Sequence, residues 1–147
     1  MEERIGILVF GAVFVDIKGY PFSLYRPDGR NAGKVVKVHG GVSRNIVEDI
    51  ANVELRPTFI SVVDKDAIGE EVVQKLKRHK VNTNYIQRIE GGLGTWLAIF
   101  DTEGELMGSI SQRPDLSKLE EVLAKHGDSL FSRCDSVIVE IIWIPSF

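Results

Sequence analysis

Short runs of aliphatic residues that are apolar on both faces constrain the fold of this 147-residue chain more than any other feature. Ile5 to Phe10 has this character, and so do Thr58 to Val63 and Ser136 to Ile144. A strand with two apolar faces is typical of a parallel sheet that helices cover on both sides. The sequence therefore predicts an α/β domain with a mostly parallel sheet and flanking helices.

Helical spacing of apolar residues appears between these strands. The segment from Gly41 to Leu55 predicts a helix on which Arg44 points away from the core, and Pro57 ends it. Asp66 can cap the next helix, and a third helix follows Pro114. The apolar positions of the first helix are Val42, Ile46, Ile50 and Val53, those of the second Ile68, Val72 and Leu76, and those of the third Leu116, Leu119 and Leu123.

The remaining segments predict loops and short strands. Gly11 to Gly19 is expected to be the loop that leaves the first strand, and Tyr20 to Val38 a small excursion of two or three strands. Thr95 to Phe100 and Leu106 to Ile110 flank a turn signal and predict a hairpin. A chain of this length is expected to form a single domain over residues 1–147.

Composition excludes several classes of function. The chain has 18 Lys and Arg against 21 Asp and Glu, a net charge of −3, and no basic stripe, so no nucleic-acid partner is expected. Cys134 is the single cysteine, which excludes a disulfide within the chain. The longest apolar run is too short to span a bilayer and follows the acidic Glu2 and Glu3, which predicts a cytoplasmic protein with no membrane partner.

Two patterns resemble known sites only weakly. Gly29 to Lys34 looks like a phosphate-binding loop, but its glycine spacing is one residue short and no strand leads into it, so a hairpin loop is expected. His39, His79 and His126 have no partner at ligand spacing, so no metal site is predicted.

The pair Gly40-Gly41, followed by Asn45, is more informative. Paired glycines let a ligand approach the backbone, and the N-terminus of a helix offers unpaired N–H donors. A turn of about 100° per residue places Asn45 beside the apolar face, so it is expected to be half-buried. The alternative is that the glycines merely begin a helix and that Asn45 bonds a neighbouring loop.

Several short strings occur in an order that is itself informative. They are Gly11-Ala-Val-Phe-Val-Asp16, Gly40-Gly41-Val-Ser-Arg-Asn45, Asp66-Ala-Ile-Gly69, Gly94-Thr95-Trp-Leu-Ala and Asp101-Thr-Glu-Gly104-Glu. Their order and spacing resemble the N-terminal half of the ribokinase-like (PfkB) family of carbohydrate and nucleoside kinases. The second and fourth strings look most like the branch that includes pseudouridine kinases.

The resemblance implies an activity and a set of site residues. Members of the family transfer the γ-phosphate of ATP, with Mg²⁺, to a hydroxymethyl group of a sugar or nucleoside. By position, Asp16 would accept hydrogen bonds from substrate hydroxyls, Gly40 and Gly41 would pack against the sugar ring, and Asn45 would hold another hydroxyl. The insertion at about residues 20–38 would be a lid that shields the site from water.

The chain also departs from the family pattern. The family has a small residue where Val47 stands, glycine at Glu54, and Gly-Asp in place of Asp64-Lys65. Its second signature, a glycine-rich loop opening a helix that carries the aspartate base, is absent, and Gly127-Asp128 is expected to follow a helix instead. The resemblance therefore implies an incomplete ribokinase-like fold, a truncated chain with the sugar subsite but no catalytic residue, inactive alone and without tight binding of ATP or Mg²⁺.

A second hypothesis is a non-catalytic sugar-binding or scaffold domain derived from such a kinase, which the altered signature positions favour. Under either hypothesis we expect a homo-oligomer, because the terminal apolar strand has no following helix to cover it and the lid offers free strand edges. The apolar residues of that terminus are Ile141, Ile142, Trp143, Ile144 and Phe147.

Overall fold

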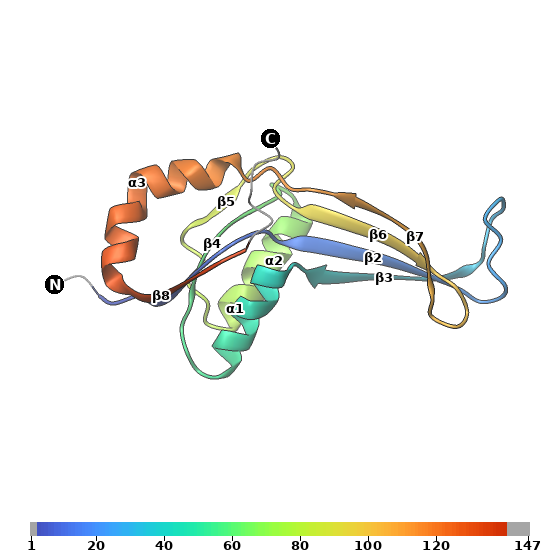
Figure 1. Ribbon diagram of the computed structural model, residues 1–147, viewed down its shortest axis with the longest axis horizontal. Coiled ribbons are helices and arrows are strands. Elements are labelled where there is room, and N and C mark those ends of the chain that lie inside the picture. The colour runs from blue at the N-terminus through green and yellow to red at the C-terminus, as the bar shows by residue number, and fades with distance from the viewer. Residues whose placement is uncertain (1–2, 141–147) are drawn as a thin grey trace.

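The computed structural model describes residues 3–140 and contains two four-stranded sheets (Figure 1). In the inner sheet all neighbouring strands are parallel, and their order is β5-β4-β1-β8. These strands are β1 (Gly6–Phe10), β4 (Thr58–Val63), β5 (Ile86–Arg88) and β8 (Cys134–Val139).

Helices cover both faces of the inner sheet (Figure 1). On one face, α3 (Ser117–Arg133) contributes Leu119 and Leu130 to a core with Leu8 of β1. On the other, α1 (Val42–Asn52) and α2 (Ala67–Arg78) form a second core around Val9 and Phe59. Successive residues of β1 thus enter different cores, which is why its sequence is apolar throughout. The predicted α/β fold with a parallel sheet is confirmed.

The outer sheet extends away from the helices, with strand order β3-β2-β6-β7 (Figure 1). Its central pair, β2 and β6, is parallel, whereas β3 and β7 each run antiparallel to their neighbours. The bounds are β2 (Phe14–Pro21), β3 (Gly33–Gly40), β6 (Gly94–Phe100) and β7 (Leu106–Gln112). The predicted hairpin across β6 and β7 is confirmed.

The loop predicted over residues 11–19 is wrong from Phe14 onward, because β2 begins there. Val15 and Ile17 pack against the inner core, while Asp16 and Lys18 lie on the opposite face of the strand. This alternation makes β2 an ordinary half-buried strand. The excursion expected over residues 20–38 is the far part of the β2–β3 hairpin: of the glycines in the apparent phosphate-binding loop, Gly29 lies in the connecting loop and Gly33 begins β3.

The orientation predicted for α1 is also wrong. Val42 is 61% exposed, whereas Arg44 is only 4% exposed. The helix turns its first residues inward through Ser43, whose hydroxyl lies 2.8 Å from the Ala12 carbonyl oxygen. That polar contact sets the rotation of the helix about its axis, and Val47 then faces the core one turn later.

The expected start of α2 is confirmed, since Asp66 Oδ1 accepts a 2.8 Å hydrogen bond from the Gly69 amide. Ile68, which was expected in its apolar face, is 37% exposed, whereas Val72 and Leu76 are buried. The pair at residues 127–128 lies inside α3 rather than after a helix. The apolar terminus from Ile141 onward falls outside the described residues.

Candidate functional site

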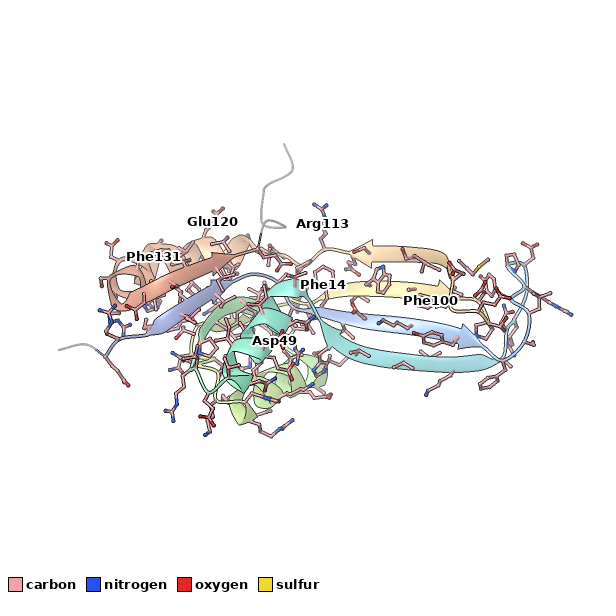
Figure 2. The ribbon with its side chains drawn as sticks, turned by 60° about the horizontal axis from the view of Figure 1, so that its bottom comes forward. Phe14, Asp49, Phe100, Arg113, Glu120 and Phe131 are labelled. Carbon is pink, nitrogen blue, oxygen red and sulfur yellow. The ribbon has the colours of Figure 1, made fainter. Side chains whose placement is uncertain are left out.

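The candidate site lies where the carboxyl ends of β1 and β8 meet the base of the outer sheet. Open α/β sheets bind ligands outside the carboxyl ends of their strands. Phe14, the first residue of β2, marks this junction in Figure 2 and pairs with Gly40 on one side and Gly94 on the other. Its ring packs directly over Gly94, where a Cβ would come within 2.5 Å of a ring carbon.

Asp16 and Gly40 are in contact at this junction. A Cβ on Gly40 would lie 2.7 Å from Asp16 Oδ2, closer than real side chains approach. The absent side chain therefore makes room for the carboxylate at the end of β3. Asp16 is half-buried, which leaves part of its carboxylate open to a ligand.

Gly41 turns the chain from β3 into α1 with φ of 99°. A Cβ there would meet the Ala12 carbonyl oxygen at 2.7 Å, so both the backbone conformation and the space demand glycine. Within the described part of the chain no side chain caps α1, and its first turn carries no acidic residue. Its leading N–H groups are therefore available to an oxygen-rich ligand.

Asn45 lies one turn along, and its amide N–H donates to the Gly41 carbonyl at 3.0 Å. The expectation that its side chain is half-buried is wrong, because Asn45 is exposed. Its Oδ1 accepts a 3.0 Å hydrogen bond from Nη1 of the buried Arg44. The structure thus brings Asp16 next to Gly40 and Asn45 next to Gly41. Because the two glycines are adjacent in sequence, both side chains lie near the same point of the backbone.

Sequence analysis missed two polar residues beneath the site. Glu140, just after β8, accepts a 3.0 Å hydrogen bond from the Ala12 amide through Oε2. The Ser43 hydroxyl lies 2.8 Å from the same Oε2, so its proton serves either this carboxylate or the Ala12 carbonyl. A lone carboxylate inside an otherwise apolar run was the available signal for Glu140.

An aromatic side chain stands next to Asp16 on the same face of the outer sheet. Trp96 of β6 is the cross-strand neighbour of Asp16. Lys18 Nζ lies 5.9 Å from the centre of the Trp96 ring, and Phe100 meets that ring edge-on at 6.4 Å between centroids. Trp96 is half-buried, so this face offers both a flat apolar surface and a carboxylate.

Charged residues behind α1 connect the site to α2. His39 Nε2 lies 3.6 Å from Glu71 Oε1, and burial lowers the pKa of His39 while the Glu71 carboxylate opposes that shift. Glu48 contacts Arg44 within α1, and its Oε1 lies 3.5 Å from Nε2 of His79.

The described part of the chain contains no cluster of metal-ligating side chains, and its apparent phosphate-binding loop is a turn. Over residues 3–140, no three His, Cys, Asp or Glu side chains gather as a metal site would require. Asn31 closes the β2–β3 loop on itself by bonding Arg26, so that loop is a turn and does not open a helix. None of the helices in this range is long and apolar enough to cross a membrane.

Comparison with known proteins places this geometry in a family. The sequence profile described as pfkB family carbohydrate kinase matches residues 4–139. The chain belongs to the pfkB family of carbohydrate kinases. The predicted resemblance is thereby confirmed.

Individual pfkB relatives agree with this assignment. Guanosine-inosine kinase of Exiguobacterium acetylicum is 37% identical over 136 residues, which cover 92% of this chain and 45% of that protein. Pseudouridine kinase of Escherichia coli K12 is 25% identical over 130 residues, or 87% of this chain and 42% of that protein. The chain therefore spans less than half the length of these curated relatives.

Solved structures show the same fold. A Clostridium perfringens protein assigned as a sugar kinase superposes with a TM-score of 0.79 and 30% identity, covering 92% of this chain and 43% of that one. Ribokinase from Giardia lamblia gives a TM-score of 0.72 at 17% identity, covering 95% and 42%. The fold is ribokinase-like.

Proposed function

We propose that this chain forms the sugar-binding part of a pfkB-family nucleoside kinase, which transfers the γ-phosphate of ATP to the hydroxymethyl group of a ribose. The contact between Asp16 and Gly40 carries the proposal. It places a half-buried carboxylate beside an uncapped helix N-terminus, so acceptors and donors for sugar hydroxyls stand together.

Each site residue has a distinct part in this proposal. Asp16 accepts hydrogen bonds from ribose hydroxyls, because an ionised carboxylate is an acceptor only. Gly40 and Gly41 let the sugar ring pack against the backbone, and Asn45 holds a further hydroxyl. The outer sheet acts as the lid, and the half-buried Trp96 beside Asp16 offers a surface on which a nucleobase can stack.

The proposal favours nucleosides over free sugars. Guanosine and inosine are the first ligands to try, because the relative that is 37% identical is a guanosine-inosine kinase. Pseudouridine is the alternative substrate that the predicted branch implies, and the 25% identity to pseudouridine kinase supports it less strongly.

Phosphate transfer in this family involves the glycine-rich loop of its second signature, which the 147-residue sequence lacks. The γ-phosphate must be held by preorganised donors, and removing such donors costs several kcal/mol of transition-state stabilisation. We therefore propose that ATP and Mg²⁺ bind productively only where the family's second signature is also present. The 147-residue chain by itself binds the nucleoside and does not phosphorylate it.

A sugar-binding or scaffold domain remains the second candidate. Glu54 favours it, because this residue holds a left-handed φ of 65° at a position where the family pattern has glycine. The two candidates share the sugar site, and they differ in whether this chain works together with the family's second signature to transfer phosphate. The proposal that this chain binds nucleoside without phosphorylating it can be contradicted directly. It would be wrong if the 147-residue chain formed a phosphorylated nucleoside from ATP and Asp16→Asn abolished that activity.

The outer sheet also supports the expected homo-oligomer. Leu97 and Ile110 are cross-strand neighbours on the face opposite Asp16, and they are 41% and 70% exposed. A row of exposed apolar side chains next to the free edge of β7 fits the same row on a second copy of this chain.

Calorimetric titration with guanosine, inosine and ribose tests the sugar site. Asp16→Asn is expected to weaken guanosine binding by at least about ten-fold, because a hydrogen bond to a charged group contributes about 1.5–3 kcal/mol. Asp49→Asn is the matched control, since Asp49 is an exposed carboxylate on α1 (Figure 2). Equal affinities for wild type and Asp16→Asn would contradict the assignment of Asp16.

A further inference from the structure

Arg44 is a buried charge whose presence the core does not explain. Only 4% of the residue is exposed, and its position in α1 lies one residue before Asn45. Burying a guanidinium costs free energy unless its donors are satisfied, and an apolar residue of similar size is often at least as stabilising. A buried arginine in this place therefore needs an explanation beyond packing.

Arg44 uses only some of its hydrogen-bond donors, and the hydrogen bond that it forms is directed at Asn45. Nη2 lies 2.5 Å from Glu48 Oε2, a close ion pair between neighbours on the same helix. Neither Nε nor Nη2 has a hydrogen-bond partner of good geometry among residues 3–140. The hydrogen bond that Arg44 does form runs from Nη1 to Asn45 Oδ1, at 3.0 Å.

Glu48 keeps the guanidinium in this position. Its Oε1 faces Lys75 Nζ at 3.9 Å and His79 Nε2 at 3.5 Å, so α2 anchors the carboxylate that neutralises Arg44. The ion pair with Glu48 thus holds Nη2 of Arg44, while Nη1 of the same guanidinium donates to Oδ1 of Asn45.

We propose that Arg44 is a positioning residue, which fixes the side-chain amide of Asn45 so that Nδ2 faces the sugar. A guanidinium has donors and no acceptor, so the amide atom that turns toward it must be Oδ1. Nδ2 is then left to donate. Asn45 recognises the oxygen of a hydroxyl, whereas Asp16 accepts the proton of one.

This inference rests on the proposed function, in which Asn45 binds a ribose hydroxyl. An exposed asparagine without such support samples both orientations of its amide and must lose that freedom when it binds. Pinning Oδ1 beforehand removes this cost, so Arg44 contributes to affinity without touching the ligand.

A double-mutant cycle with guanosine as ligand tests the inference on the full 147-residue chain. Arg44→Met is expected to weaken binding about ten-fold in the wild-type background and less than about two-fold when Asn45→Ala is already present. Arg56→Met, which changes an exposed arginine, is the matched control and should leave affinity unchanged. Equal losses in both backgrounds would overturn the inference.

Arg44→Lys separates the hydrogen bond from the charge. Lysine retains the positive charge beside Glu48 but lacks the planar fork, so it is expected to bind guanosine nearly as weakly as Arg44→Met. Full affinity in Arg44→Lys would show that charge alone matters and would overturn the inference. This variant also serves if Arg44→Met does not fold.

The ligand-free protein provides a readout that does not depend on the proposed function. In nitrogen-15 NMR spectra the side-chain amide signals of Asn45 are expected to shift in Arg44→Met and to stay in place in Arg56→Met. Unshifted Asn45 signals in Arg44→Met would overturn the inference even if guanosine binds. Shifted signals together with no guanosine binding by wild type would support Arg44 and contradict the proposed function instead.

Discussion

The inner strand β4 and the outer strand β7 show how differently the two sheets are stabilised. Every residue of β4 is buried, and every residue of β7 is exposed. β4 lies between two cores and between two parallel neighbours, whereas β7 is an edge strand whose one partner among residues 3–140 is β6. Burial therefore holds the inner sheet, while the outer sheet depends on its strand pairing and remains free to meet a ligand or another chain.

The largest expected effect comes from a change in the inner sheet. Phe59→Ala should lower the free energy of unfolding by about 3–5 kcal/mol, because it leaves a cavity where a fully buried ring contacts the core. Ile110→Ala in β7 is the matched outer-sheet change and should cost less than about 0.5 kcal/mol. Urea unfolding of the two variants measures the difference, and similar losses would break the contrast between the sheets.

A change at the junction of the sheets should reduce affinity more than stability. In Gly40→Ala the new Cβ would lie 2.7 Å from Asp16 Oδ2 and displace the carboxylate. Guanosine binding is expected to weaken by about ten-fold or more, since misplacing a hydrogen-bonding group loses most of its bond. Gly19→Ala in β2 is the control, because a Cβ there meets only an ordinary contact at 3.8 Å. Unchanged affinity in Gly40→Ala would place the ligand elsewhere.

The helix ends beneath the inner sheet carry strain that can be relieved. Glu54 and Lys80 follow α1 and α2 with φ of 65° and 64°, a conformation that suits glycine. Glu54→Gly should raise the free energy of unfolding by about 0.5–1 kcal/mol, because the left-handed penalty exceeds the entropy that glycine adds to the unfolded chain. Glu103→Gly, at an exposed turn residue without positive φ, should not stabilise. Thermal unfolding of both variants measures the two changes in stability, and equal effects of Glu54→Gly and Glu103→Gly would contradict the prediction.

His39 connects the outer strand β3 to α2 and should give a small pH dependence. Burial lowers the folded-state pKa of His39 below the ordinary value of about 6.5, so the unfolded chain binds more protons between the two values. Stability should therefore fall as pH decreases below about 6.5. His39→Gln should flatten that decline relative to wild type in urea titrations from neutral to mildly acidic pH. If stability declines with decreasing pH equally steeply in His39→Gln and wild type, His39 is not the cause of the decline.

Association is expected to depend on the outer sheet. Ile110→Lys places a charge in the apolar row of β6 and β7 and is expected to shift sedimentation toward monomer without changing stability. Ser111→Lys, on the opposite face of the same strand, is the control. A dimer that persists in Ile110→Lys would exclude this face as the interface.

Much of the inner sheet could be predicted because burial leaves a clear pattern in sequence. Thr58 to Val63 matched β4 exactly, and Asp66 marked the start of α2 through its side-chain bond. The loop predicted over residues 11–19 overlaps the start of β2, although Val15, Asp16 and Ile17 alternate as a half-buried strand does.

The residues of the candidate site could be predicted from the sequence, but the residues that hold them in place could not. Gly40, Gly41 and Asn45 could be identified from the residue pattern and Asp16 from the resemblance, and the roles of all four remain predictions. Hydrophobic periodicity predicts Arg44 at the surface, because the pattern treats every charged residue as exposed. In the structure Glu48 of the same helix forms an ion pair with Arg44, which allows the guanidinium to be buried. Contacts such as Ser43 with Glu140 join residues far apart in sequence, which local patterns do not contain.

The central claim is that a nucleoside binds at the junction of the two sheets. Nitrogen-15 NMR titration of the 147-residue chain with guanosine tests it most directly, because each backbone amide reports separately. We predict that the largest shifts occur at Gly40, Gly41 and Asn45, and that amides of α3 on the far face of the inner sheet do not move. Shifts centred on α3 or on the β2–β3 loop, or no shifts at millimolar guanosine, would contradict the account.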